Sequence, residues 1–140
     1  MLNVTKVDLW SNAIDHQPGG LMTKLEALVK AGADLDLILA RGPAAPAGKG
    51  AVLLSPITGQ RQQQAAEQAG FQRNSGLYCL RLAGMDEPGY AYRLLFTLAG
   101  EGLNVHELAA VTLEGQFVMY VAFDTAADAD KAMNRLQRPL

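Results

Sequence analysis

The amino-acid sequence predicts an α+β fold made of two tandem units, each an antiparallel sheet with two helices on one face. The first observation behind this prediction is an internal repeat: with a shift of seventy positions, Pro18-Gly19 falls on Pro88-Gly89. The register holds without a gap from Val7 to Leu37. Further matching pairs are Leu25 and Leu95, Leu28 and Leu98, Gly32 and Gly102, and Leu35 and Val105. So many matches in one register indicate a duplication rather than chance.

The second observation is that both copies show the same order of elements. Val4–Trp10 and Leu77–Leu82 are short β-favouring runs that predict first strands, and each is followed by a polar turn that ends in Pro-Gly. Apolar residues then recur at helical spacing, which predicts one helix in each copy. These residues are Leu21, Leu25, Leu28 and Val29 in copy one and Ala91, Leu94, Leu95 and Leu98 in copy two. Gly32 and Gly102 lie just past them, where a left-handed residue ends a helix at little cost.

The rest of each copy predicts a hairpin and a second helix. The expected strands are Leu35–Ala40 and Ala51–Ser55 in copy one and Asn104–Val111 and Phe117–Phe123 in copy two. The returning strands match only if the shift drops by three, which places extra residues in the loop between Arg41 and Gly50. The second helices are expected near Gln60–Ala69 and over Ala126–Leu136. Thr125 to Asp128 has the form of a capping box at the start of the Ala126–Leu136 helix.

Strand, helix, strand, strand, helix is most of a ferredoxin-like βαββαβ unit. Phe71–Ser75 can supply the last strand of copy one. Copy two has only Gln137–Leu140 left, and Pro139 cannot donate to a strand ladder. We therefore expect the last strand of copy two to be short, absent or supplied by a neighbour. The expected domains are residues 1–72 and 73–140.

Composition excludes several classes of function. Hydrophobic residues make up 49% of the chain and charged residues 19%, which is enough apolar material to close a core. The formal charge of −2, with both signs interspersed, offers no basic face to nucleic acid. Cys79 is the single cysteine, which excludes an internal disulfide and fits a reducing compartment. No apolar stretch approaches about 18 residues, so we expect a cytoplasmic protein without a membrane segment.

The repeated turn between first strand and first helix is the candidate binding site. His16-Gln-Pro-Gly-Gly20 and Asp86-Glu-Pro-Gly-Tyr90 place Pro-Gly at a helix start, where free N–H groups and the macrodipole favour an anion. Glycine lets that anion approach the backbone closely. A zwitterion also needs an acceptor for its ammonium, which Asp34 or Asn104 could provide from the start of the next strand. The turn and the strand start together suit an amino acid.

One stretch of copy two resembles a known family. The run Asp86-x-Pro88-Gly89-x9-Ala99-x2-Gly102-x-Asn104-Val105 is similar to the signature of ACT domains, βαββαβ modules that bind amino acids and regulate metabolism. Copy one, with Pro18-Gly19-Gly20-Leu21 and Gly32-Ala33-Asp34-Leu35, resembles it more loosely. The resemblance spans nearly the whole chain. It implies two tandem ACT-type units of the free-standing kind, without an attached enzyme.

The resemblance also implies a set of ligand-binding residues, because the ligand of ACT proteins lies where two domains meet, against the Pro-Gly turn. Copy two supplies Asp86, Gly89, Tyr90 and Asn104, and copy one supplies His16, Gly19, Gly20, Leu21 and Asp34. His16 stands where copy two has Asp86, and Asp34 stands where copy two has Asn104. The two copies therefore need not bind equally.

Other conspicuous residues point to structure rather than chemistry. His16 and His106 are far apart in the sequence with no further ligand-type cluster, so we expect no metal site. Cys79 lies inside a predicted strand, where a buried inert thiol is expected. The loop over residues 42–50 has the composition of a slack hairpin loop, with a lid over a ligand as the alternative. No cofactor is implied.

The sequence offers no candidate for catalysis. Neither first strand is followed by a Gly-rich phosphate loop with an arginine, and the central strands do not carry the stacked aromatics of an RNA-binding sheet. The favoured interpretation is a regulatory sensor that binds a small molecule, most simply an amino acid. The alternative is a ligand-free interaction module that pairs with a metabolic enzyme or with itself through its sheet edges. A homodimer or a closed intramolecular pair is expected.

Overall fold

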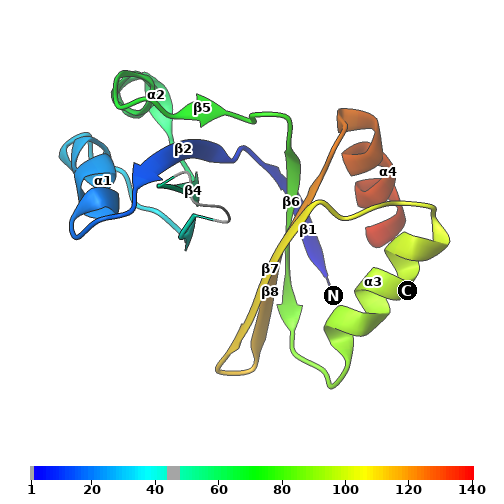
Figure 1. The fold of residues 1–140 in the computed structure, drawn as a ribbon. Helices are drawn as coiled ribbons and strands as arrows, with labels where there is room; N and C mark the ends of the chain where they lie inside the picture. Colours follow the sequence, from blue (N-terminus) through cyan, green and yellow to red (C-terminus); the bar gives the residue numbers. More distant parts are fainter. Residues whose placement is uncertain (1, 44–47) are drawn as a thin grey trace. The chain divides into compact units, whose positions relative to one another are not determined.

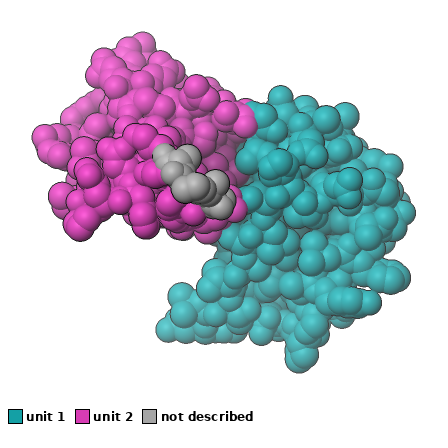
Figure 2. Space-filling view, in the orientation of Figure 1, with its two compact units in different colours: residues 1–7, 76–140 teal, residues 8–75 magenta. Residues whose placement is uncertain are grey.

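The computed structural model describes residues 2–43 and 48–140, and it divides into two compact units. Unit 1 comprises residues 1–7 and 76–140, and unit 2 comprises residues 8–75, as Figure 2 shows in two colours. Each unit has its own sheet of four strands and its own hydrophobic core. The predicted fold class, two tandem ferredoxin-like units, is confirmed.

Unit 2 contains copy one from Asp8 onward (Figure 1). Its elements are β2 (Trp10–Asp15), α1 (Gly20–Lys30), β3 (Leu37–Arg41), β4 (Lys49–Ser55), α2 (Gly59–Gln68) and β5 (Gln72–Arg73). The strands lie in the order β3-β4-β2-β5, with every neighbour antiparallel. Trp10 and Leu54 are fully buried in the core that the two helices cover. The expected last strand at Phe71–Ser75 is present as the short β5. Four residues of the expected 42–50 loop, 44–47, lie outside the described part of the chain.

Unit 1 contains copy two and one strand from the N-terminal end of the chain. Its elements are β1 (Asn3–Val7), β6 (Tyr78–Met85), α3 (Tyr90–Gly100), β7 (Glu107–Leu113), β8 (Gln116–Phe123) and α4 (Ala126–Leu136). The sheet order is β1-β6-β8-β7, which is the order of unit 2 with β1 in the place of β5. The last strand of copy two is therefore supplied by residues 3–7, which pair with β6 in antiparallel register.

The predicted first strand Val4–Trp10 is wrong as a single element. It is two strands, because Val4 belongs to the core of unit 1 and Trp10 to the core of unit 2. The chain leaves β1 at Asp8, whose carboxylate accepts a hydrogen bond of 2.6 Å from the Asn74 side chain. The backbone N–H of Leu9 donates to the same side chain over 3.1 Å. Residues 1–7, which the expected boundaries placed in the first domain, thus lie in the other unit.

The first helix of each unit forms as its apolar periodicity predicts, except that Val29 of the expected stripe is 68% exposed. Leu28 in α1 and Leu98 in α3 are fully buried against their sheets. Gly32 and Gly102 follow with φ values of 82° and 75°, the left-handed conformation expected after a helix end. The carbonyls of Leu28 and Leu98 each accept a hydrogen bond from a residue beyond that glycine, at 3.0 and 3.1 Å, which completes a C-terminal cap.

The last helix begins at the predicted cap. The backbone N–H of Asp128 donates to the Thr125 hydroxyl over 3.1 Å. An acidic residue in the first turn also suits the positive end of the helix. This prediction is confirmed.

Candidate functional site

The Pro-Gly turn of unit 1 joins the end of β6 to the start of α3. Gly89 is the N-cap residue with a φ of 74°, a left-handed conformation that glycine adopts at no steric cost. The backbone N–H of Tyr90 donates to Glu87 over 3.1 Å, and that of Arg93 donates to Gly89 over 3.1 Å. No side chain caps this helix start. The N–H groups of Ala91 and Tyr92 have no protein acceptor in the described part of the chain, so they can bind an anion.

The turn of unit 2 has the same backbone. Gly19 caps α1 with a φ of 81°, and the N–H of Gly20 donates to Gln17 over 3.0 Å. The N–H of Thr23 donates to Gly19 over 2.9 Å, as Arg93 does to Gly89 in unit 1. The sequence repeat therefore corresponds to a repeat of backbone geometry at both candidate sites.

The acidic residues at the turn of unit 1 are already engaged. Asp86 accepts a hydrogen bond of 3.3 Å from the Thr112 hydroxyl, and its own N–H donates to Gly115 over 2.9 Å. Because Thr112 is in β7 and Gly115 is in the β7–β8 turn, the candidate site lies at the hairpin end of the sheet. Glu87 forms an ion pair of 2.6 Å with Arg93.

Tyr90 packs between polar and apolar neighbours. Its ring centroid lies 5.0 Å from that of Phe117, and the Arg93 guanidinium lies 5.3 Å from the ring. Partial burial, with Glu87 as the second cause, raises the pKa of the Tyr90 phenol above its ordinary value, so the side chain is a neutral hydrogen-bond donor at pH 7.

The turn of unit 2 differs in its side chains. His16 is exposed, and its backbone N–H donates to Gly48 over 3.4 Å. Gly20 is buried, and a Cβ atom there would lie 2.1 Å from the carbonyl oxygen of Asp15. Leu21 packs against the core of its unit. In this unit Gly20 and Leu21 thus have clear structural roles.

Asp34 and Asn104 are not close to the turn of their own unit. Each lies beyond the C-terminal end of the first helix, whereas the turn precedes its N-terminal end. A helix of 11 residues separates them, which spans about 16 Å. Both side chains are exposed. A single unit therefore does not bring the carboxylate-binding and ammonium-binding groups together.

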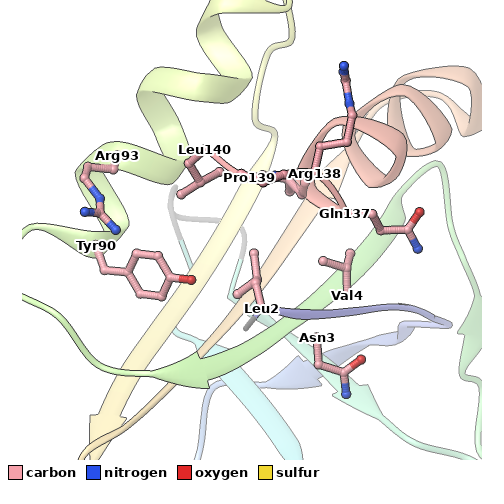
Figure 3. Close-up of a pocket in the computed structure, with 10 residues that line it drawn as sticks. Leu2, Asn3, Val4, Tyr90, Arg93, Gln137, Arg138, Pro139 and Leu140 are labelled. Carbon is pink, nitrogen blue, oxygen red and sulfur yellow. The ribbon is translucent and has the colours of Figure 1, made fainter.

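A cavity of about 450 Å³ lies within unit 1, beside the turn. It is lined by β1, the start of α3 and the residues that follow α4, and Tyr90 is the one predicted site residue on its wall (Figure 3). Sequence reasoning missed Leu2, Val4 and Arg93 as lining residues. No sequence signal marks the first two, because they reach the cavity only through the pairing of β1 with β6.

Cys79 and His106 lie outside the two turns. Burial raises the pKa of the Cys79 thiol to about 12, so the reactive thiolate is scarce. His106 contacts Asp124, with 2.6 Å between Nδ1 and Oδ1, at an exposed position. Within residues 2–43 and 48–140 no three His, Cys, Asp or Glu side chains gather as metal ligands. None of the described helices is long and apolar enough to cross a membrane.

Comparison with known proteins extends the fold assignment. No protein-family model matches the chain, and no curated protein matches its sequence. A protein from Bacteroides thetaiotaomicron has a similar structure, with a TM-score of 0.77, 16% identity, and coverage of 96% of this chain and 88% of that one. The regulatory subunit of aspartate kinase from Thermus thermophilus gives a TM-score of 0.66 at 17% identity, covering 97% and 94% of the two chains.

The corresponding regulatory subunit from Thermus flavus gives a TM-score of 0.61, also at 17% identity and with the same coverage. Identities this low show a shared fold and leave function to be argued from the site. The chain thus has the tandem α+β fold of these proteins, over nearly their whole length.

Proposed function

We propose that this protein is a regulatory sensor that binds an amino acid between two copies of unit 1. The observation that carries the proposal is the separation of Asn104 from the Gly89 turn. Within one unit the two lie at opposite ends of α3, so a zwitterion can reach both only if a second unit brings its own Asn104 to the turn.

The edge strand β7 offers a way to form that pair. β7 lies at one edge of its sheet, and its Val111 and Leu113 side chains are 59% and 70% exposed. An edge strand with exposed apolar side chains favours pairing with another strand. A two-fold axis beside β7 would set two copies of the strand antiparallel and form a homodimer.

Antiparallel pairing would place the groups correctly. Asn104 precedes the start of β7, whereas Asp86 is hydrogen-bonded to Gly115 just beyond its end. The start of one β7 would lie beside the end of the other, so Asn104 of one copy would face the Gly89 turn of its partner. The carboxylate would accept from the N–H groups of Ala91 and Tyr92, and the ammonium would donate to the Asn104 amide oxygen.

In this proposal unit 2 has a lesser role in binding. Its turn has the same backbone, but His16 and Asp34 stand at the polar positions. We therefore expect the two ligand sites of a dimer to be formed by unit 1. Binding of the amino acid would stabilise the paired arrangement by its differential affinity, and a metabolic enzyme in the cytoplasm would sense that change. The protein itself would not be an enzyme.

A thermal-shift screen of the purified protein against the proteinogenic amino acids tests this function. At least one amino acid is expected to raise the melting temperature at millimolar concentration. Asn104→Ala should then weaken its binding about tenfold or more, because a hydrogen bond to a charged group is lost. His106→Ala, a change in the same segment outside the proposed contacts, should leave the affinity unchanged. If no amino acid shifts the melting temperature, the sensor proposal fails.

A ligand-free interaction module is the second candidate, and exposed aromatic side chains on α3 favour it. Tyr92 and Phe96 are 70% and 69% exposed, and their ring centroids are 6.2 Å apart. A surface pair of this kind suits a protein partner. In that case amino acids would leave both the melting temperature and the oligomeric state unchanged, and Phe96→Ser would reduce association.

A further inference from the structure

The cavity in unit 1 has a chemistry of its own. Its polar wall carries two arginines, Arg93 and Arg138, and no Asp or Glu is among its lining residues. Its apolar part includes Leu2, Val4 and Leu136, together with Pro139 and Leu140. A volume of about 450 Å³ is within the range of pockets that hold small metabolites. Positive charge beside an apolar surface suits an anion with an apolar body.

Figure 3 shows which side chains form the polar end of the cavity. Tyr90 extends its ring toward Leu2, and its hydroxyl is directed into the space between them. Arg93 comes from the next turn of α3 and lies over the same ring. Arg138 points away, so it contributes long-range charge rather than a contact. The phenol and the Arg93 guanidinium thus form the polar end of the cavity.

Both polar groups can donate to a ligand. The Tyr90 hydroxyl carries one O–H donor and is directed into the cavity (Figure 3). Arg93 donates from one terminal nitrogen to Glu87 over 2.6 Å, whereas a guanidinium carries five N–H donors. A carboxylate that entered the cavity could therefore accept from both side chains while the ion pair with Glu87 is kept.

The same position in unit 2 lacks both of these polar side chains. The counterpart of Tyr90 is Gly20, where a Cβ atom would lie 2.1 Å from a backbone oxygen, and the counterpart of Arg93 is Thr23. Thr23 donates its hydroxyl to Gly19 over 2.9 Å and carries no charge. The cationic end is thus specific to unit 1, unlike the turn, which both units share.

We propose that this cavity binds a small monocarboxylate with an apolar chain and no ammonium group, at a site separate from the amino-acid site at the turn. The apolar chain lies against Leu2, Val4 and Leu136, and the carboxylate accepts from Arg93 and Tyr90. An α-ammonium group would lie beside the Arg93 guanidinium and be repelled by it, which separates this ligand class from the amino acids proposed for the turn. The inference does not depend on amino-acid binding.

The test uses 4-methylpentanoate, which is leucine without its ammonium group. Titration of the full chain, followed by NMR, is expected to show saturable shifts of the methyl signals of Leu2, Val4 and Leu136. The uncharged 4-methylpentan-1-ol should bind about tenfold more weakly or worse, because it lacks the charge-assisted hydrogen bonds. Leucine should not shift these methyl signals.

Two variants that change the affinity for 4-methylpentanoate in opposite directions add a second test. Arg93→Gln should weaken 4-methylpentanoate binding about tenfold or more, whereas Glu87→Gln should strengthen it, since the competing carboxylate is removed from the guanidinium. Arg61→Gln in unit 2, which removes an equal charge at a residue that does not line the cavity, serves as the control and should have no effect.

Three results would overturn the proposal: no saturable binding, equal affinity for the alcohol, or an Arg93→Gln variant that binds as the wild type does. The amino-acid site is judged separately, because Asn104→Ala should leave 4-methylpentanoate binding unchanged.

Discussion

Gly20→Ala is expected to lower the free energy of unfolding of unit 2 by about 3 kcal/mol or more. The new Cβ would lie 2.1 Å from the carbonyl oxygen of Asp15 and 3.1 Å from its carbonyl carbon, and both atoms belong to the backbone. No rotamer change can relieve such a contact, so the turn or the start of α1 must move. Urea unfolding followed by circular dichroism measures the loss.

The neighbouring glycine provides the control. At Gly19 a Cβ atom would meet only the flexible end of Met22, at 3.8 Å, so Gly19→Ala has only the left-handed φ of 81° to overcome. That conformation costs an L-residue about 1–2 kcal/mol. Equal losses in the two variants would show that the close approach of Asp15 to α1 does not exist in solution.

Gly89→Asp is expected to weaken amino-acid binding about a hundredfold or more. The new carboxylate would stand at the start of α3, beside the N–H groups proposed for the ligand carboxylate, and like charges at such a distance cost several kcal/mol. No described atom lies within 4 Å of a Cβ placed at Gly89, so the protein should still fold. Isothermal titration with the amino acid found in the thermal-shift screen measures the effect.

Gly89→Asn separates charge from shape. Asparagine has nearly the size of aspartate, and both tolerate the left-handed φ of 74° found at this position. The asparagine variant should therefore retain most of the affinity that the aspartate variant loses. If both variants bind as the wild type does, the turn is a structural feature without a ligand.

Much of the fold could be predicted from the sequence, because the repeat compares two copies of each element. The helical periodicity around Leu28 and Leu98 and the glycines that follow gave the first helices with little error. The failure at Val4–Trp10 has a physical cause. The run has uniform β propensity, and local pattern cannot show that Val4 packs in one core and Trp10 in another.

The candidate site was harder to predict than the fold. The turn geometry followed from Pro-Gly before a helix, and the left-handed Gly19 and Gly89 agree with it. Which elements lie close together is harder to predict than the geometry of a turn. The predicted helix between Gly89 and Asn104 already implies that the two residues lie a helix length apart. Nothing local in the sequence says that Leu2 reaches the wall of a cavity beside Tyr90, because that contact depends on the pairing of β1 with β6, which long-range packing decides.

A mixed dimer distinguishes a site shared between two copies from a site within one chain, because the proposed site takes Gly89 from one copy and Asn104 from the other. Gly89→Asp and Asn104→Ala would be carried on differently tagged chains, and the heterodimer would be purified and titrated with the amino acid. One of its two sites would combine both changes, and the other would combine two unchanged residues. One site of wild-type affinity per heterodimer is expected, whereas each variant alone should bind weakly. A heterodimer that binds no better than the separate variants would contradict a site shared between two copies.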